Sequence, residues 1–301
     1  MFYNRCSSHV KYTGRFAPTP SGRLHFGSLV TALGAFLRAR SLNGRFLLRI
    51  EDLDTSRCRQ EYTDSILRDL EILGFDYDGK VKIQSKNLSP YKDAVIQLLQ
   101  SHSAFYCTCT RHSLKEHPCT CFKSSTRPHS RYSIRFRPDF TVDCAFEDRL
   151  HGRVVTPPAR DYLQLVRADG LIAYNLACVV DDHLDNITEV VRGNDLIEIT
   201  PRQNAIYRAL GFDTPDYIHL PLVLNSRGDK LSKQNHALPV LEQMSPAEAL
   251  IKGLDFLGQD TAELKEHDYN CQQILKYAVS HFDLQKISCK DKELIISSDS
   301  N

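Results

Sequence analysis

The sequence predicts an α/β fold built on a parallel sheet, and two observations near its start carry this prediction. A strand ending at Phe16 is followed by the loop 17–22 and by a helix starting near Ser28, whose apolar residues recur at helical spacing. A second strand over 46–50 and a second helix over 62–73 follow directly. This order of elements is typical of right-handed β-α-β units on a parallel sheet.

The pattern breaks between about 106 and 158, in a stretch rich in Cys, Ser, Arg and Pro, and then resumes. We expect strands over 187–192 and 217–224 with a helix over 202–210 between them, and helical patches toward the C-terminus. The interrupted stretch is therefore interpreted as an insertion between two halves of one sheet domain. The predicted division gives the two halves residues 1–105 and 161–240, the inserted subdomain 106–160, and a short helical C-terminal region 241–301.

Composition narrows the class of protein. The 301 residues are 42% apolar and 25% charged, as in ordinary globular proteins, and no run of about 18 apolar residues suggests a membrane span. Residues 1–10 lack the apolar core of a signal peptide, so we expect a cytoplasmic protein without a membrane partner. The ten cysteines are then expected to be reduced, with any cluster binding metal. Because the net charge is only +1, a nucleic-acid partner would need a local basic patch.

The segment 15–28 lies between a strand end and a helix start, where open parallel sheets bind ligands. Free N–H groups at a helix N-terminus attract phosphate oxygens, and Gly22 and Gly27 allow a nucleotide to approach the backbone closely. His25 could donate to a phosphate. Taken alone, the segment is equally compatible with a tight turn in which Ser28 caps the helix.

A second polar segment, 226–234, follows the late strand and carries Lys230 and Lys233 on either side of Ser232. Such a loop can close over a triphosphate, with Lys233 neutralising charge in the transition state. A lone Lys-Leu-Ser-Lys sequence is common on protein surfaces. Its combination with the first segment, at the opposite end of the chain, is specific.

The two segments resemble the two signatures of the class I aminoacyl-tRNA synthetases, with His25-Phe26-Gly27-Ser28 in the first and Lys230-Leu231-Ser232-Lys233-Gln234 in the second. Further segments resemble the glutamate branch of that family, in order: 15–22, 49–52, 174–177, 180–183 and 191–193. The resemblance covers about 12–236. It implies a Rossmann-like doubly wound parallel sheet with an inserted zinc-binding subdomain and a short helical C-terminal segment. It also implies that His25, Lys230 and Lys233 are catalytic, and that His25, Gly27, Ser28 and Lys233 bind ATP, which is used with Mg²⁺.

Glutamate carries two carboxylates and one ammonium group, so its site needs arginine side chains and one acid. Arg15 and Arg192 are the candidates for the carboxylates, and we expect Arg192 to bind the one on the side chain. Glu51 can hold the ammonium group and Tyr174 can add a hydroxyl donor. The resemblance adds the backbone of Phe16, Ala17, Pro18 and Thr19.

Other interpretations of these residues stay open. Arg15 and Glu51 are also compatible with surface ion pairs, and Tyr174 with a place in the core. Asp181, Asp182 and His183 fit contacts with ATP or the acceptor, and fit helix capping or local ion pairs equally well.

Four cysteines form two pairs in the inserted region, Cys107-Thr108-Cys109 and Cys119-Thr120-Cys121. This spacing predicts one tetrahedral, structural Zn²⁺ site. In the family that the chain resembles, a Cys-x-Cys pair is followed by a Tyr-Pro-Gly-Thr-Cys-like segment whose Tyr and last Cys complete the site. Cys107, Cys109 and Cys121 are therefore expected ligands, and the fourth is either His117, by position, or Cys119, by chemistry.

The stretch 234–301 is too short to hold the anticodon-reading part of full glutamyl- and glutaminyl-tRNA synthetases. The chain resembles instead the branch that consists of a catalytic domain alone and attaches glutamate to the queuosine base in the anticodon loop of tRNA(Asp). A basic stretch is a candidate phosphate contact, and is equally compatible with a solvated loop: Lys123, Arg127, Arg131, Arg135 and Arg137, with Tyr132 and Phe136 interleaved. A minimal synthetase that charges the tRNA 3′ end, or a non-catalytic descendant that binds glutamate or RNA, are the alternatives.

Overall fold

The fold is taken from a computed structural model of the chain, which describes residues 11–110, 112–124, 126–137, 144–157, 162–225, 228 and 238–293. The first half of the central sheet consists of three parallel strands, β1 (Thr13–Phe16), β2 (Arg45–Ile50) and β3 (Lys82–Ile83), with β2 in the middle. Helix α1 (Phe26–Ser41) connects β1 to β2, and α2 (Gln60–Ile72) lies between β2 and β3. The predicted β-α-β order is confirmed.

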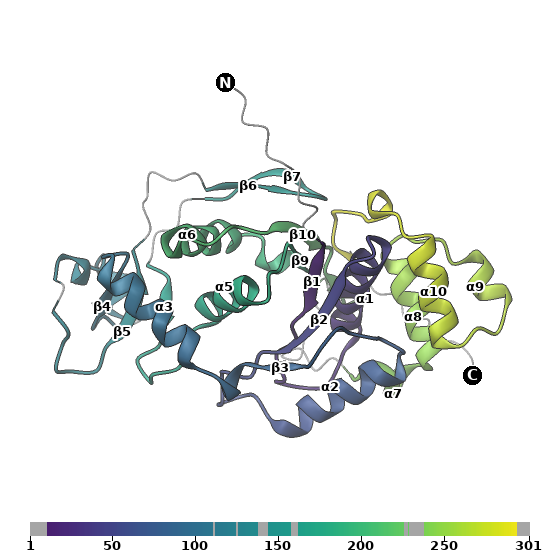
Figure 1. The fold of residues 1–301 in the computed structure, drawn as a ribbon, viewed down its shortest axis with the longest axis horizontal. Coiled ribbons are helices and arrows are strands. Elements are labelled where there is room, and N and C mark those ends of the chain that lie inside the picture. Colours follow the sequence, from purple (N-terminus) through teal and green to yellow (C-terminus); the bar gives the residue numbers. More distant parts are fainter. Residues whose placement is uncertain are drawn as a thin grey trace.

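The second half of the sheet is built on β9 (Glu189–Gly193) and β10 (Asp216–Leu220), which are parallel and connected by α6 (Thr200–Leu210). A hairpin extends it: β6 (Ala145–Asp148) pairs with β10 and β7 (Gly152–Val155) pairs with β6. The two halves meet where β1 lies beside β9, and there Thr188 N donates to Thr13 O at 2.9 Å (Figure 1). From this junction the strand order runs outward in both directions, as in a doubly wound sheet with a topological switch point.

Helices cover both faces of the sheet (Figure 1). On one face α1 packs with α8 (Pro246–Phe256) and α10 (Cys271–Ser280), so closely that a Cβ on Gly253 would lie 3.0 Å from Leu33. On the other face lie α5 (Tyr174–Leu184) and α6, which pack with α3 (Ser89–Gln100). Each face has its own buried apolar cluster. The junction of β1 and β9 is therefore enclosed by helices on both sides.

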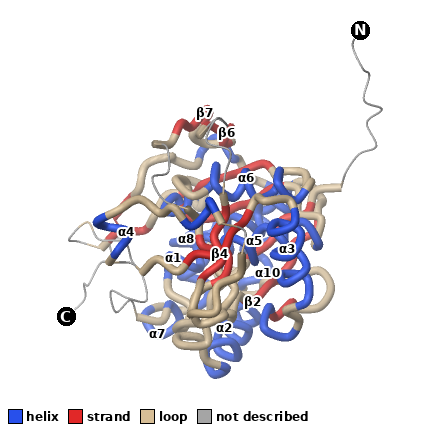
Figure 2. The backbone as a smooth tube through the Cα atoms, turned by 90° about the vertical axis from the view of Figure 1, so that its left-hand side faces the viewer, coloured by secondary structure: helices blue, strands red, loops and turns tan. Residues whose placement is uncertain are grey.

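The inserted region contains a separate antiparallel sheet in which β5 (Ser133–Phe136) lies between β4 (Ala104–Cys107) and β8 (Gln164–Val166). The short helix α4 (Ser113–Glu116) follows β4, and this part lies at the far end of α3 from the central sheet (Figures 1 and 2). The predicted boundaries at 105, 160 and 240 stay a prediction. Strand β4 runs across the boundary at 105. Strand β8 lies beyond 160 but belongs to this small sheet, whereas β6 and β7 lie before 160 but join the central sheet.

The C-terminal region is helical, as predicted, with α7 (Val240–Gln243) and α9 (Ala262–Glu266) beside α8 and α10. It returns to the second half of the fold through β12 (Lys292–Glu293), which pairs with β11 (Val223–Leu224). The single strand expected over 217–224 is wrong, because Pro221, which has no N–H to donate, separates β10 from β11. In the described part of the chain, no helix has the length and apolar character that crossing a membrane requires.

Candidate active site

The two candidate arginines lie at the carboxyl ends of the strands that meet at the switch point, Arg15 in β1 and Arg192 in β9. Each is only 4% exposed, so the interpretation of Arg15 as a surface residue is wrong. In an open parallel sheet, ligands bind outside this junction. The fold therefore places both guanidinium groups where a substrate is expected.

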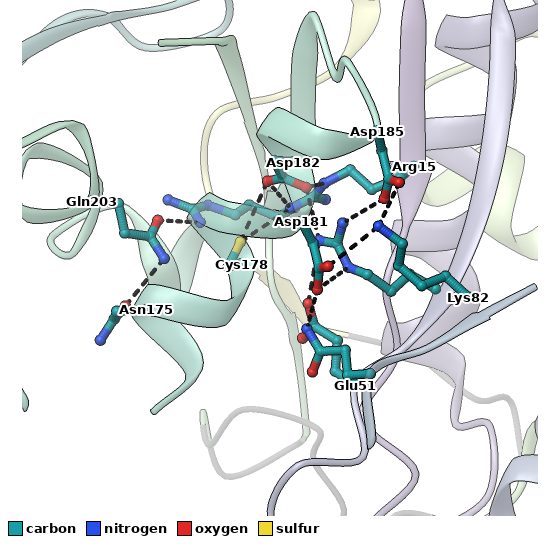
Figure 3. A network of polar contacts seen from close by, with 12 residues as sticks. Arg15, Glu51, Lys82, Asn175, Cys178, Asp181, Asp182, Asp185 and Gln203 are labelled. Atoms are coloured by element: carbon teal, nitrogen blue, oxygen red, sulfur yellow. Dashed lines mark hydrogen bonds and ion pairs between the residues drawn. The ribbon is translucent and has the colours of Figure 1, made fainter. Parts of the chain in front are cut away.

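Arg15 has a buried counter-ion. Its Nε and Nη2 atoms donate to the two carboxylate oxygens of Asp182 on α5, at 3.1 and 3.3 Å (Figure 3). Its Nη1 donates to Val191 O at 3.3 Å, across the junction between the strands. The charge of Arg15 is thus neutralised within the protein, and one Nη1 N–H is left without an acceptor among the residues described.

Sequence reasoning missed Arg49, a second buried arginine at the centre of this network. It is 1% exposed, and its Nη2 lies 2.8 Å from Asp182 Oδ1 and 3.4 Å from Glu51 Oε1. Burial raises the pKa of Asp182, but the charges of Arg15 and Arg49 outweigh this and hold it well below its usual value. The available signal was a charged residue within the otherwise apolar segment 46–50.

Asp181 and Asp182, near the end of α5, both belong to this network of buried ion pairs and hydrogen bonds. Asp181 accepts hydrogen bonds from Gln84 Nε2 at 2.8 Å and from the Tyr91 hydroxyl at 2.9 Å, and Lys82 bridges it to Asp185 (Figure 3). His183 instead stacks on Phe212, with ring centroids 3.6 Å apart. Of the interpretations left open for 181–183, the structure favours local ion pairs for the two aspartates.

Glu51 follows β2 directly and is buried. Its backbone N–H donates to Pro18 O at 3.0 Å, which holds the loop after β1 against it. Burial raises the pKa of its carboxyl group to about 7, although Arg49 and Arg15 lower it. Glu51 is thus an acid whose charge changes near neutral pH, next to the loop that contains Phe16, Ala17 and Thr19.

Tyr174 opens helix α5 and is 36% exposed, so it is not a core residue. Its hydroxyl is nevertheless surrounded by protein atoms, and this burial raises its pKa well above the usual value. Glu51 raises that pKa further while Arg192 and Arg15 lower it. The charges of Glu51, Arg192 and Arg15 therefore act on the Tyr174 hydroxyl, while part of the Tyr174 side chain stays accessible to solvent.

Arg192 differs from Arg15 and Arg49 because its hydrogen-bond partners among the described residues are all uncharged side chains or backbone atoms. Nε donates to His219 Nε2 at 3.1 Å, Nη1 to Gln203 Oε1 at 2.7 Å, and Nη2 to Thr200 Oγ1 at 2.7 Å. Nη2 also donates to Leu196 O at 3.4 Å. In the part of the chain that the structure describes, no carboxylate lies within 4.0 Å of its guanidinium nitrogens, and one Nη1 N–H has no acceptor. Sequence reasoning identified none of these partners, because each is a common polar residue in a helix or strand.

The loop after β1 ends in the N-terminus of α1, as expected for a nucleotide site. The residue that caps this helix is His25, whose Nδ1 accepts from Ser28 N at 3.2 Å. The alternative in which Ser28 caps the helix is wrong, since the helix already begins at Phe26. Gly27 lies in its first turn. Lys230 and Lys233 lie outside the described residues, so their place beside His25 stays a prediction.

The four cysteines of the inserted region come together. Their Sγ atoms all lie within 4.8 Å of one another, with Cys107–Cys119, Cys109–Cys121 and Cys109–Cys119 separations of 3.6, 3.6 and 3.8 Å. A tetrahedron with metal–sulfur bonds of about 2.3 Å has edges of about 3.8 Å, so these four can hold one metal ion. The exposed His117 is not part of this group, whereas Cys119 is.

The basic stretch of the inserted region is largely accessible. Lys123, Arg127, Arg131 and Arg137 are exposed, and Arg135 is half-buried, where its Nη1 donates to Tyr162 O. The aromatic residues are less available: Phe136 is buried, and Tyr132 packs edge-to-face on Tyr106. The surface therefore presents cations rather than rings for stacking.

Similarity to known proteins agrees with this geometry. A family model described as tRNA synthetases class I (E and Q), catalytic domain, matches residues 11–295. The chain belongs to this family. Among similar class I synthetases, the glutamyl-Q tRNA(Asp) synthetase of Citrobacter koseri is 44% identical over 286 residues, 93% of this chain and 95% of that protein. The one from Escherichia coli K12 is 45% identical over 284 residues, 92% of this chain and 91% of that protein.

Solved class I synthetase structures share the fold. The crystal structure of a glutamate tRNA ligase from Elizabethkingia meningosepticum in complex with its amino acid has a TM-score of 0.78 and 25% identity, and covers 94% of this chain and 67% of that one. A glutamate-tRNA synthetase from Elizabethkingia anophelis matches equally well, with a TM-score of 0.78. The predicted class I synthetase fold is thus confirmed, and the chain is a ligase of the aminoacyl-tRNA synthetase type.

Proposed function

We propose that this enzyme activates L-glutamate with ATP to form glutamyl-adenylate and transfers the glutamate to the queuosine base of tRNA(Asp). The names of the relatives that match more than nine-tenths of this chain support this acceptor. The buried side chains of Arg15, Glu51 and Arg192 support this amino acid. We also propose that the enzyme acts in the cytoplasm, where both ATP and tRNA are present.

The observation that carries the choice of amino acid is the buried charge of Arg192, which no carboxylate among the described residues balances. A buried cation is costly without a counter-ion, so this one is suited to receive an anion from the substrate. The free Nη1 N–H can donate to a carboxylate oxygen of glutamate or to the amide oxygen of glutamine, so the preference for glutamate comes from the positive charge, which binds a carboxylate more strongly than a neutral amide. Arg192 then binds the side-chain carboxylate through Nη1 rather than through a two-pronged contact.

Other residues bind the remaining groups of the glutamate substrate. Glu51 holds the ammonium group, Tyr174 donates its hydroxyl, and the loop 16–19 shapes the backbone side. Arg15 supports the α-carboxylate with its remaining Nη1 N–H. That carboxylate attacks the α-phosphorus of ATP in line and displaces pyrophosphate, so the protein contributes positioning and charge stabilisation without a covalent intermediate. His25, Gly27, Ser28, Lys230 and Lys233 bind the nucleotide, and Mg²⁺ accompanies the triphosphate.

The function is tested by ATP–pyrophosphate exchange with each of the twenty amino acids, followed by acceptor mapping. We expect exchange with glutamate in at least one of two conditions, with tRNA present or with tRNA absent. We also expect labelling of queuosine-bearing tRNA(Asp). Labelling of the 3′ end of tRNA(Glu) instead would favour the minimal glutamyl-tRNA synthetase. Exchange with no amino acid, with and without tRNA, would favour a non-catalytic descendant.

The metal of the inserted region is proposed to be structural Zn²⁺, held by Cys107, Cys109, Cys119 and Cys121. The donor set fits, because four thiolates at tetrahedral spacing are a common ligand set of structural Zn²⁺ and leave no open position for a substrate. We predict that Cys119→Ser lowers the bound zinc well below one equivalent, whereas His117→Ala keeps about one equivalent per chain. Elemental analysis of both purified variants measures this. Loss of zinc in His117→Ala alone would reassign the fourth ligand.

The raised pKa of Glu51 predicts how glutamate binding depends on pH. Only the ionised carboxylate attracts the substrate ammonium, so below pH 7 binding requires the loss of a proton from Glu51. The KM for glutamate should therefore fall about tenfold per pH unit as pH rises toward 7 and level off above it. This dependence should vanish in Glu51→Gln and persist in Glu61→Gln, which changes an exposed residue of α2. An unchanged profile in Glu51→Gln would remove Glu51 from the ammonium site.

A further inference from the structure

A buried pair of side chains lies next to Arg192: Asp148 of β6 and His219 of β10. Both side chains are 0% exposed, and His219 Nδ1 lies 2.7 Å from Asp148 Oδ2. On the other side of the ring, His219 Nε2 lies 3.1 Å from both Arg192 Nε and Thr200 Oγ1. Asp148, His219 and Arg192 thus form one chain of hydrogen bonds across the neighbouring strands β6, β10 and β9.

The chemistry of the partners fixes the proton on His219. Arginine can only donate, so Nε2 must accept from Arg192 with its lone pair, and the ring proton is on Nδ1, where Asp148 accepts it. Burial lowers the pKa of His219, Asp148 raises it and Arg192 lowers it further, and the outcome is a neutral ring. A neutral histidine orients the guanidinium without supplying an anion to it.

Hydrogen bonds from the backbone hold Asp148 in the position that keeps the ring proton of His219 on Nδ1. Its Oδ1 accepts from the backbone N–H groups of Leu150 and His151, at 2.9 and 3.0 Å, and its Oδ2 accepts from His219 N at 3.1 Å as well as from the ring. All four acceptor directions of the carboxylate are used. The hairpin β6–β7 therefore contributes a fixed anion to the active site, and two residues, His219 and Arg192, lie between this anion and the substrate.

We propose that His219, oriented by Asp148, is the positioning residue that directs Arg192 Nη1 at the side-chain carboxylate of the substrate. It occupies the Nε edge of the guanidinium while Gln203 and Thr200 occupy the others, so the one remaining N–H has a fixed direction. Placing a carboxylate of the protein there instead would have neutralised Arg192, as Asp182 neutralises Arg15. The inference rests on the proposed function, in which Arg192 binds glutamate.

A matched pair of variants tests it. In His219→Gln the side-chain amide can place an acceptor where Nε2 was, and in His219→Asn only the position of Nδ1 is retained. We expect His219→Asn to raise the KM for glutamate about tenfold or more, the size expected for a hydrogen bond to a charged group, while the KM for ATP is unchanged. His219→Gln should stay within about threefold of the wild type. Asp148→Asn should resemble His219→Asn, because its oxygen is needed by the two backbone donors and its NH₂ then reverses the tautomer.

The outcomes separate the inference from the proposed function. If the wild type exchanges with glutamate and all three variants keep its KM, His219 is not a positioning residue. If the wild type does not exchange with glutamate, the proposed function fails, and ¹⁵N-histidine NMR still decides the arrangement. At neutral pH the spectrum should show His219 uncharged with its proton on Nδ1, and a proton on Nε2 would overturn the inference. The same spectrum, with thermal unfolding, is recorded for each variant, so that loss of structure is distinguished from loss of orientation.

Discussion

Arg192→Leu is expected to lower kcat/KM for glutamate in ATP–pyrophosphate exchange by about 10²-fold or more. Truncating one partner of a buried, hydrogen-bonded charge pair costs about 2–5 kcal/mol, and tenfold corresponds to about 1.4 kcal/mol. The loss should fall mainly on the KM for glutamate, because the contact is made to the bound amino acid as well as in the transition state. Glutamine should lose much less, so the preference for glutamate over glutamine should shrink.

Two further variants make this result specific. Arg192→Lys keeps the charge but cannot serve His219, Gln203 and Thr200 at once, so it should lie between the wild type and Arg192→Leu. Arg208→Leu removes an exposed arginine of α6, the helix that follows β9 in the chain, and should exchange at the wild-type rate. Undiminished selectivity for glutamate in Arg192→Leu would show that another group binds the side-chain carboxylate.

Asp182→Asn is expected to lower the free energy of unfolding by about 3–5 kcal/mol, the usual cost of leaving a buried charge without its partner. The substitution leaves Arg15 with no carboxylate among the described residues, although Arg49 keeps Glu51, Asp181 and Asp185. Urea unfolding, followed by circular dichroism, measures the change. Asp185→Asn is the matched control, since its carboxylate is more exposed and shares Lys82 with Asp181, and it should cost clearly less.

The lowered pKa of Asp182 also predicts how its contribution to the free energy of unfolding changes with pH. Because the folded state holds the pKa of Asp182 well below its usual value of about 4, its contribution is complete above that value and is lost only as pH falls below it. The difference in stability between the wild type and Asp182→Asn should therefore be constant around neutrality and shrink in strong acid. Equal stability of Asp182→Asn and Asp185→Asn at pH 7 would contradict the central place of Asp182.

The sequence predicted those parts of the site that depend on the order of elements along the chain. The positions of Arg15, Glu51 and Arg192 follow from one rule, that residues at the carboxyl ends of parallel strands meet at one edge of the sheet. The cysteine cluster was predictable because ligand spacing in short loops is local. In both cases the pattern lies within a few residues of one strand end or one loop. The structure groups Cys119, and not His117, with the other three cysteines.

The sequence did not predict which polar side chains from different helices and strands contact each other. Nothing in the chain connects Arg49 with Asp182 or Arg192 with His219, because these contacts depend on how β2, α5, β9 and β10 pack. The same is true of β6 and β7, which were assigned to the insertion and instead extend the central sheet. Polar residues of α5 and β10 have no sequence signature that separates a solvated face from a buried one.

The meeting of β1 and β9 has a consequence for how the molecule is assembled. Residues 175 positions apart must come together before Thr13 and Thr188 can bond, so the two arginines share a site only when both ends of the sheet exist. Closing so long a loop is slow, and until it closes the N-terminal half contains Arg15 and Arg49 without the acids of α5. An incomplete chain therefore has no weaker version of the active site: recognition of the amino acid begins only when synthesis has passed β9.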